Sequence, residues 1–333
     1  MKQGSGSITE ILRPILDTYR DSAVAVIGCH SAGIAREPCE IDSLVVSNEW
    51  RAPLSFRLGE TFCDLSFLSE KESLNPVDPE VAVSLANSKV VRDSGLVLST
   101  SVAANLAVLS ANAVRSSQRR LAACLKALSR TDEALLRGAK RDANYWVLSA
   151  SYEFASAWLY SLEVIPSPSH LLQRMKEHSK GSGRNFEAFA KGAGLEIASR
   201  KECGDRLEGL SLLYDLLDSY QAGVSPQPTV TDIGFRIVRA KAEHLAAVRE
   251  HAESYSFLGG EVVRAVLAVD GSVRPGKGPR GRNNEVLSSL SDERRGLLSG
   301  RLVRELGLER PTQEVQDALE LLKDRTAKLA RRI

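Results

Sequence analysis

The chain has 333 residues, of which 43% are hydrophobic and 26% charged, the composition of an ordinary globular protein with room for about two domains. No apolar run reaches the roughly 18 residues of a membrane span, and the N-terminus lacks a basic region followed by an apolar core, which excludes a transmembrane helix and a signal peptide and indicates a cytoplasmic protein. The net charge of +2 is unevenly distributed, because residues 1–99 contain 9 Lys or Arg against 14 Asp or Glu and the remainder is basic.

Helix and strand signals alternate over the first hundred residues. Ser7-Ile8-Thr9-Glu10 has the spacing of a capping box and opens a helix to about Tyr19, in which Pro14 produces a kink or a later start. Asp78-Pro79-Glu80 is typical of the first turn of a further helix. Alternating apolar residues predict strands at Ala23–Gly28, Glu40–Val46, Leu54–Leu58, Thr61–Leu68 and Lys89–Arg92. We therefore expect an α/β domain with a mixed sheet over residues 7–99, within an α+β protein.

The segment 23–47 has a pattern with a chemical use. Residues two apart in a strand point to the same face, so Glu40 and Asp42 stand side by side while the residue between them turns into the core. Two close carboxylates repel each other unless a cation lies between them, and a divalent cation with oxygen ligands is the usual solution. Gly28 ends the first strand in a turn whose backbone N–H groups can approach an anion, and a short helix over Ser31–Arg36 would favour phosphate at its N-terminus. The sequence therefore predicts adjacent metal and phosphate sites.

These residues resemble the signature of the polymerase-beta-type nucleotidyltransferases, in particular small bacterial and archaeal members with a helical C-terminal domain. That signature is a strand ending in Gly-Ser or Gly-Gly, a connection, Asp-x-Asp or Asp-x-Glu on the next strand, and a third carboxylate on a later strand. Gly28 to Gly33 is similar to the glycine turn, Glu40-Ile41-Asp42 takes the place of the paired carboxylates, and Asp64 fits the third. Ser88 to Gly95 is similar to the closing strand and turn of the family.

The resemblance implies transfer of a nucleoside monophosphate from an NTP to an acceptor hydroxyl, with Mg²⁺ or Mn²⁺ as cofactor. Glu40, Asp42 and Asp64 would be both the metal ligands and the catalytic carboxylates. The NTP and the acceptor, which could be a small molecule, a protein or RNA, stay open. The nucleotide-binding residues that the resemblance indicates are Gly28, Cys29, Ser31, Arg137, Lys140 and Arg141.

Two positions depart from the signature. Cys29 stands where the family has Ser or Gly, which removes a hydroxyl but keeps the backbone donor, and Glu40 replaces the first Asp, which lengthens the side chain by one methylene. Both departures favour an alternative of another class. This alternative is a catalytically degenerate nucleotidyltransferase fold that binds a nucleotide, RNA or a protein partner, as an antitoxin-like module would.

After Ser99 the helical periods become long and predict an all-helical domain over residues 100–333, with a division near residue 225 left open. Ser129 to Glu133 is expected to end one helix, which starts at Val102 and reaches Leu128, and to cap a second that extends to about Glu163. Arg137, Lys140 and Arg141 would share one helix face, for which a solvated surface is the more common meaning. Further helices are expected at His170–His178, Asn185–Lys191, Asp205–Tyr220, Thr231–Glu253, Phe257–Val269, Glu285–Leu298 and Gln313–Ala330.

The remaining signals concern partners. Asp270 to Arg282 places four positive charges, from Arg274 to Arg282, on a Gly- and Pro-rich chain, which could contact nucleic acid or close over a triphosphate, or could be a solvated loop without function. Long amphipathic helices would suit a homodimer. The five cysteines form no CxxC pair, so we expect reduced, buried thiols, with a zinc site among Cys29, Cys39 and Cys63 as the alternative.

Overall fold

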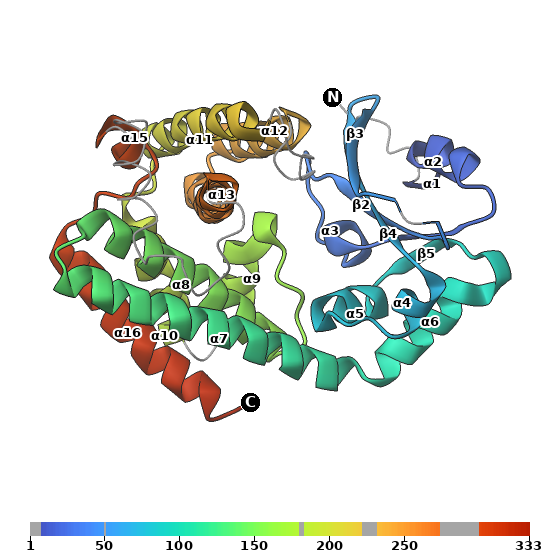
Figure 1. Ribbon diagram of the computed structural model, residues 1–333, viewed down its shortest axis with the longest axis horizontal. Coiled ribbons are helices and arrows are strands. Elements are labelled where there is room, and N and C mark those ends of the chain that lie inside the picture. Colours follow the sequence, from blue (N-terminus) through green and yellow to red (C-terminus); the bar gives the residue numbers. More distant parts are fainter. Residues whose placement is uncertain (1–7, 50, 180–182, 222–231, 274–299) are drawn as a thin grey trace. The chain divides into compact units, whose positions relative to one another are not determined.

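The computed structural model describes residues 8–49, 51–179, 183–221, 232–273 and 300–333 (Figure 1). The chain forms two compact units, Met1–Arg115 and Ser116–Ile333, called here the N-terminal unit and the helical unit. The predicted domain limits of 7–99 and 100–333 stay a prediction, and the division near residue 225 falls outside the described residues. Together the two units have an α+β architecture with a larger helical part, which confirms the predicted fold class.

A five-stranded mixed sheet organises the N-terminal unit, with the strands in the order β3-β4-β2-β1-β5. Strands β2 and β4 are parallel, and the other neighbouring pairs are antiparallel. The hairpin of β3 and β4 follows β2 and returns the chain, so that β4 runs in the same direction as β2. All five predicted strands are present, as β1 (Ala23–Val26), β2 (Ile41–Val46), β3 (Leu54–Leu58), β4 (Thr61–Leu68) and β5 (Lys89–Arg92).

Both faces of this sheet are covered by helices, as Figure 1 shows. Because successive strand residues point to opposite faces, Val24 and Val26 pack against helices α1 (Ile8–Ile11) and α2 (Arg13–Thr18), whereas Ala23 and Ala25 face the other layer. That second layer is formed by the helices α4 (Glu70–Leu74), α5 (Pro79–Ala86) and α6 (Val97–Ala107). The N-terminal helix prediction is confirmed with its break, since Pro14 lies in the first turn of α2.

The predicted helix over Ser31–Arg36 is wrong. The short helix of this region is α3 (Gly28–Ser31), which starts directly after β1. The backbone N–H of Ala32 donates to the carbonyl of Gly28 at 3.1 Å, and Gly33 then turns the chain out with a φ of 68°. A glycine that can adopt positive φ ends the helix at the position where the sequence pattern suggested a start.

Helices pack around one core in the helical unit, and the long helix α7 (Leu109–Leu136) begins in the N-terminal unit and continues into it. The centre of the core includes Tyr145 and Phe154 from α8 and Phe189 from α10, all three fully buried. The helices that follow α7 are α8 (Lys140–Tyr160), α9 (Leu171–His178), α10 (Gly183–Ala193), α11 (Arg200–Gln221), α12 (Asp232–Ala247), α13 (His251–Val273), α15 (Gly300–Glu305) and α16 (Thr312–Ala330). Short 3-10 turns lie at Ser94–Leu96, Pro168–His170 and Leu195–Ile197.

Several predicted helix limits in this part are wrong. Ser129 to Glu133 does not end a helix, because Thr131 is buried and its hydroxyl donates to the carbonyl of Ala127 at 2.9 Å while α7 continues. The helix predicted from Val102 begins earlier, at Val97, and breaks at Val108.

The helix predicted for Thr231–Glu253 ends instead at Ala247. Arg249, with a φ of 63°, separates it from α13, which begins at His251 and not at Phe257. The predicted helix Glu285–Leu298 lies outside the described residues. Over the residues that the structure describes, no single helix is long and apolar enough to cross a membrane, although α6 and α7 pass the same test of length and composition when taken together as a bent pair.

Candidate active site

Three carboxylates meet at one end of the sheet. Each of Glu40, Asp42 and Asp64 offers an oxygen, and these three oxygens lie within 4.8 Å of one another. Asp42 and Asp64 are directly paired in the parallel register of β2 and β4, so their side chains leave the sheet on the same face. Glu40 lies two residues before Asp42 and Ile41 between them is 1% exposed, in the opposite core layer. The structure therefore brings together the three acids that the sequence singled out.

The donor set of this cluster suits a hard divalent cation. All three residues are half-buried, where partial exclusion of water strengthens the repulsion between their negative charges. A cation between them removes that cost, and ions that prefer carboxylate oxygens are Mg²⁺, Mn²⁺ and Ca²⁺ rather than soft metals. The residues therefore fit a divalent cation by chemistry and by proximity. Their roles as metal ligands and catalytic groups stay predictions.

Gly28 allows one of these carboxylates to lie directly against the backbone. It has a φ of 70°, and a Cβ built at this position would overlap Oδ2 of Asp42. Next to it, the N–H of Ile27 donates to the carbonyl of Asp42 at 2.9 Å and continues the pairing of β1 and β2 up to the cluster. Any side chain at position 28 would force either the turn or the Asp42 carboxylate to move. The site therefore requires glycine at this position.

The negative charge of the cluster contributes to the raised pKa values of the neighbouring thiols, Cys29 and Cys63. A hydrogen bond with Cys39 is the main cause that raises the pKa of Cys29, and burial and the negative charges of Asp42 and Glu40 raise it further. Burial raises the pKa of Cys63 to about 12, with smaller contributions from Asp64 and Asp42. Both thiols are therefore protonated at neutral pH. All five cysteines are free thiols, as expected, but Cys39 is only half-buried whereas the other four are buried; Sγ of Cys29 lies within 4.8 Å of Sγ of Cys39.

The predicted phosphate-binding residues are placed less uniformly. Gly28, Cys29 and Ser31 all belong to α3, next to the carboxylates, and the Ser31 hydroxyl donates to the carbonyl of Gly28 at 2.9 Å. Arg137, Lys140 and Arg141 do not share one helix face, because α7 ends at Leu136 and α8 begins at Lys140. Gly138, with a φ of 70°, turns the chain between them, and Arg141 forms an ion pair with Glu309 at 3.5 Å. All three belong to the helical unit, and the basic segment Arg274–Arg282 lies outside the described residues.

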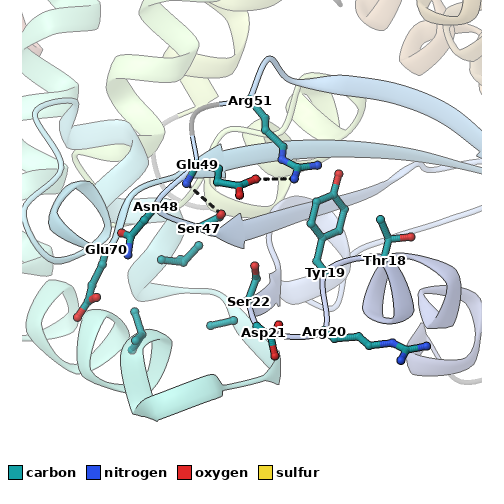
Figure 2. A pocket seen from close by; sticks show the side chains of 13 residues that line it. Thr18, Tyr19, Arg20, Asp21, Ser22, Ser47, Asn48, Glu49, Arg51 and Glu70 are labelled. Carbon is teal, nitrogen blue, oxygen red and sulfur yellow. Dashed lines mark hydrogen bonds and ion pairs between the residues drawn. The ribbon is translucent and has the colours of Figure 1, made fainter.

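A cavity of about 390 Å³ lies at the opposite end of the same sheet (Figure 2), and no sequence pattern indicated it. Its lining includes Ala23, where β1 begins, and Val46, where β2 ends, whereas the carboxylates lie near the start of β2. Arg51 pairs with Glu49 at 2.7 Å and stacks over the ring of Tyr19 at 5.1 Å. The cavity does not include the three acids, so the candidate active site rests on the carboxylate cluster.

Comparison with known proteins gives limited information. No protein-family model matches the sequence, and no curated protein matches it at a significant level. Among solved structures, the chain is similar to a nucleotidyltransferase-like protein from Exiguobacterium sibiricum 255-15, with 10% identity and a TM-score of 0.36 over 80% of this chain and 78% of that one.

Proposed function

We propose that the N-terminal unit transfers a nucleoside monophosphate from an NTP to an acceptor hydroxyl, with Mg²⁺ or Mn²⁺ held by Glu40, Asp42 and Asp64. The observation that supports this most is the approach of three half-buried carboxylates within 4.8 Å of one another, with Asp42 and Asp64 on two neighbouring parallel strands and Glu40 directly before the first of them. Exposed acids without a function account for one such residue, but they do not account for three convergent ones next to a glycine turn at the end of a strand.

The residues would divide the chemistry as follows. A divalent cation at the cluster would stabilise the negative charge on the transferred phosphoryl group. The Asp64 carboxylate would accept the proton of the acceptor hydroxyl, whose oxygen would bond to the α-phosphorus of the NTP as the bond to the leaving pyrophosphate breaks. The turn at Gly28 and Cys29 would donate backbone N–H groups to phosphate oxygens, and the contact with Gly28 would keep the Asp42 carboxylate in place.

The alternative from another class is a fold that binds a nucleotide, RNA or a protein partner without catalysis. This alternative is supported by Cys29, the residue after Gly28, which is 5% exposed and carries a protonated thiol in place of a hydroxyl. The other departure supports catalysis, because the longer Glu40 side chain still brings its carboxylate into the cluster.

A transfer assay separates the two functions. The full chain is incubated with each α-³²P-labelled NTP and with Mg²⁺ or Mn²⁺, in the presence of total RNA, protein or small-metabolite extracts. Asp42→Asn and Asp64→Asn each remove one negative charge from the cluster at constant shape, and Asp17→Asn is the matched control because Asp17 is exposed on α2 of the same unit.

We expect label transfer by the wild type and by Asp17→Asn, and a loss of at least about 100-fold in Asp42→Asn and Asp64→Asn, the size of effect typical for removal of a group that stabilises developing charge. The labelled product then identifies the acceptor class and the NTP. If a folded wild type transfers no nucleoside monophosphate to any acceptor, the enzyme is refuted and the binding module takes its place. If the cluster variants transfer label as well as the control, the carboxylate cluster is not the active site.

A further inference from the structure

A second site candidate lies inside the helical unit, away from any motif in the sequence. A cavity of about 400 Å³ opens there between α11, the start of α13 and the segment that joins α15 to α16. Its lining includes two residues that are almost completely buried, Tyr255 at 1% exposure and Arg310 at 8%. The remaining ionisable side chains of the lining are more exposed and form a rim.

The buried side of this cavity carries positive charge. Arg310 donates to the carbonyls of Lys191 at 2.6 Å and Gly192 at 3.0 Å, and Arg206, at 1% exposure, donates to the carbonyls of Leu306 at 3.1 Å and Tyr255 at 3.0 Å. Within the described part of the chain, neither guanidinium forms an ion pair. Neutral carbonyls satisfy donors but do not neutralise a buried charge, so the two cations retain a favourable interaction for an anion.

Electrostatics and packing support the same conclusion. Burial lowers the pKa of Arg310; the exposed Glu196 opposes this effect, and the positive charge of Arg206 adds to it. The guanidinium of Arg206 stacks over the ring of Tyr255 at 3.5 Å from the ring centroid. The two buried cations therefore act on the same small volume.

The hydroxyl of Tyr255 can donate a hydrogen bond to a ligand. It is buried, and it has no hydrogen-bond partner among the residues that the structure describes. Gly307, which has a φ of 71°, also lines the cavity, and a Cβ at that position would lie 2.7 Å from this hydroxyl and would overlap Nη2 of Arg206. Because a buried hydroxyl without a partner costs free energy, a ligand that accepts a hydrogen bond from it would be stabilised there.

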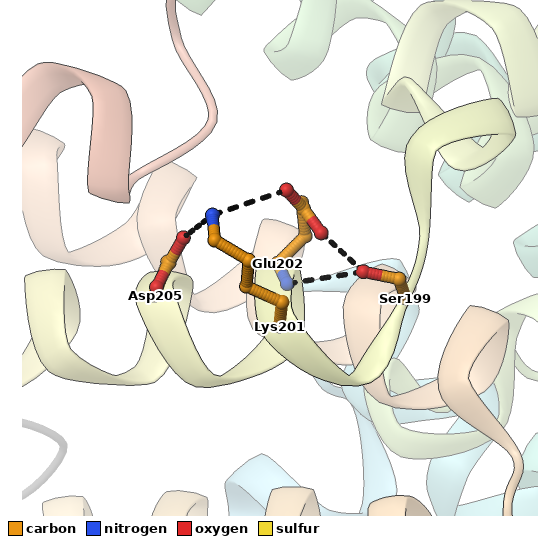
Figure 3. A network of polar contacts seen from close by, with 4 residues as sticks. All are labelled: Ser199, Lys201, Glu202 and Asp205. Atoms are coloured by element: carbon orange, nitrogen blue, oxygen red, sulfur yellow. Dashed lines mark hydrogen bonds and ion pairs between the residues drawn. The ribbon is translucent and has the colours of Figure 1, made fainter.

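The rim has the opposite character. Figure 3 shows part of it on the first turns of α11, where Lys201 contacts Asp205 at 2.8 Å and Glu202 at 3.5 Å. The backbone N–H of Glu202 donates to the hydroxyl of Ser199 at 3.3 Å, which fixes this acid at the start of the helix. Four acids of the lining, Glu202, Asp205, Glu305 and Glu309, outnumber its two exposed bases, Lys201 and Arg304, and Glu309 also pairs with Arg141 from outside the lining.

We propose that this cavity binds a small zwitterion, a free α-amino acid, with the carboxylate on Arg310 and Tyr255 and the ammonium group toward the rim acids. A buried cationic side and an acidic rim match the two charges of such a molecule and their separation across a small volume. A triphosphate fits poorly, because its negative charges would meet the rim acids. The site is therefore distinct from the nucleotide site proposed for the N-terminal unit, and it stands without it.

Calorimetric titration of the full chain tests this assignment. The probes are the twenty L-amino acids, acetate as a carboxylate without an ammonium group, and inorganic phosphate as an anion without one. We expect at least one amino acid to bind with one site per chain and to raise the unfolding temperature. Acetate is expected to bind more weakly than this amino acid, and phosphate is expected not to bind in the cavity.

Variants connect the binding to the cavity. Tyr255→Phe removes only the hydroxyl, and we expect it to weaken the amino acid about tenfold, the effect of one hydrogen bond to a charged group. Tyr145→Phe is the matched control, since it removes a buried hydroxyl that donates to the carbonyl of Val263 and lies outside the cavity lining. Asp205→Asn, at the exposed rim, should weaken the amino acid several-fold and leave acetate unchanged.

The opposite results overturn the proposal. They are no binding of any amino acid to the folded wild type, equal affinity in Tyr255→Phe and wild type, or phosphate that competes with the amino acid at equal affinity. If Tyr255→Phe does not fold, as judged by its circular dichroism, the Asp205→Asn variant decides, because its side chain is 41% exposed and no core packing depends on it.

Discussion

Substitution of Gly28 by Ala tests the contact on which the candidate active site depends. Alanine at position 28 would have to adopt a φ of 70°, and its methyl group would overlap Oδ2 of Asp42. Gly33→Ala is an unusually close control, because Gly33 has a φ of 68° in the same connection but has nothing within 4 Å of a built Cβ. The two variants therefore share the backbone cost and differ only in the collision with the carboxylate.

The magnitudes follow from these two contributions. An Ala in the left-handed region costs about 1 to 2 kcal/mol, which is the full effect expected for Gly33→Ala. Forcing an extra methyl group into a filled site adds about 1 to 3 kcal/mol, so Gly28→Ala should lose about 2 to 5 kcal/mol of unfolding free energy in the N-terminal unit. The affinity for Mn²⁺ should fall about tenfold in Gly28→Ala only, because the Asp42 carboxylate is displaced from the cluster.

Amide hydrogen exchange of the β1 and β2 backbone is the suitable assay, because it reports the opening free energy of this unit separately from that of the helical unit. Calorimetry with Mn²⁺ gives the second readout. Equal losses of opening free energy in both glycine variants would show that the Asp42 carboxylate does not lie against the backbone at position 28. Unchanged Mn²⁺ affinity in a destabilised Gly28→Ala would show that the cation does not depend on the Asp42 position.

Two further predictions concern the stability of each unit. Burial raises the pKa of Asp93, but hydrogen bonds from Ser99 and from the backbone N–H of Leu98 outweigh it and hold the pKa below the ordinary value of 3.8. A lowered pKa stabilises the fold above pH 3.8, and this contribution is lost as the pH falls through the lower folded value. Asp93→Ala should therefore cost about 1 kcal/mol of unfolding free energy at pH 7 and progressively less in acid, as measured by hydrogen exchange at both pH values. A cost that is independent of pH contradicts the capping role. In the helical unit, Phe154→Ala should leave a cavity in the core and cost about 3 to 5 kcal/mol in exchange of the α8 amides, and a loss below about 1 kcal/mol would mean that this ring is not part of the core.

Local pattern was sufficient for the sheet of the N-terminal unit. All five strands lie where alternating apolar residues predicted them, because four of them contribute to both core layers, β3 contributes to one, and Gly or Pro residues lie near several strand ends. The prediction failed where a local signal competed with burial. Thr131 belongs to a run of helix-capping residues, yet α7 continues through it, because the side chain is buried in the helical core and satisfies its hydroxyl within the helix.

The strand period of two, a local property of the backbone, was enough to predict that Glu40 and Asp42 share one side of the chain, although β2 itself begins at Ile41. The approach of Asp64 to these two acids depends on the parallel register of β2 and β4, which no local period contains, and a shift of one residue would turn Asp64 to the other face. The same holds for the cavity of the helical unit, where Arg206, Tyr255 and Arg310 are far apart in the chain and no spacing relates them. Periodicity determines which residues close in sequence share a face of a helix or strand, whereas a site built from distant segments depends on how those segments pack together.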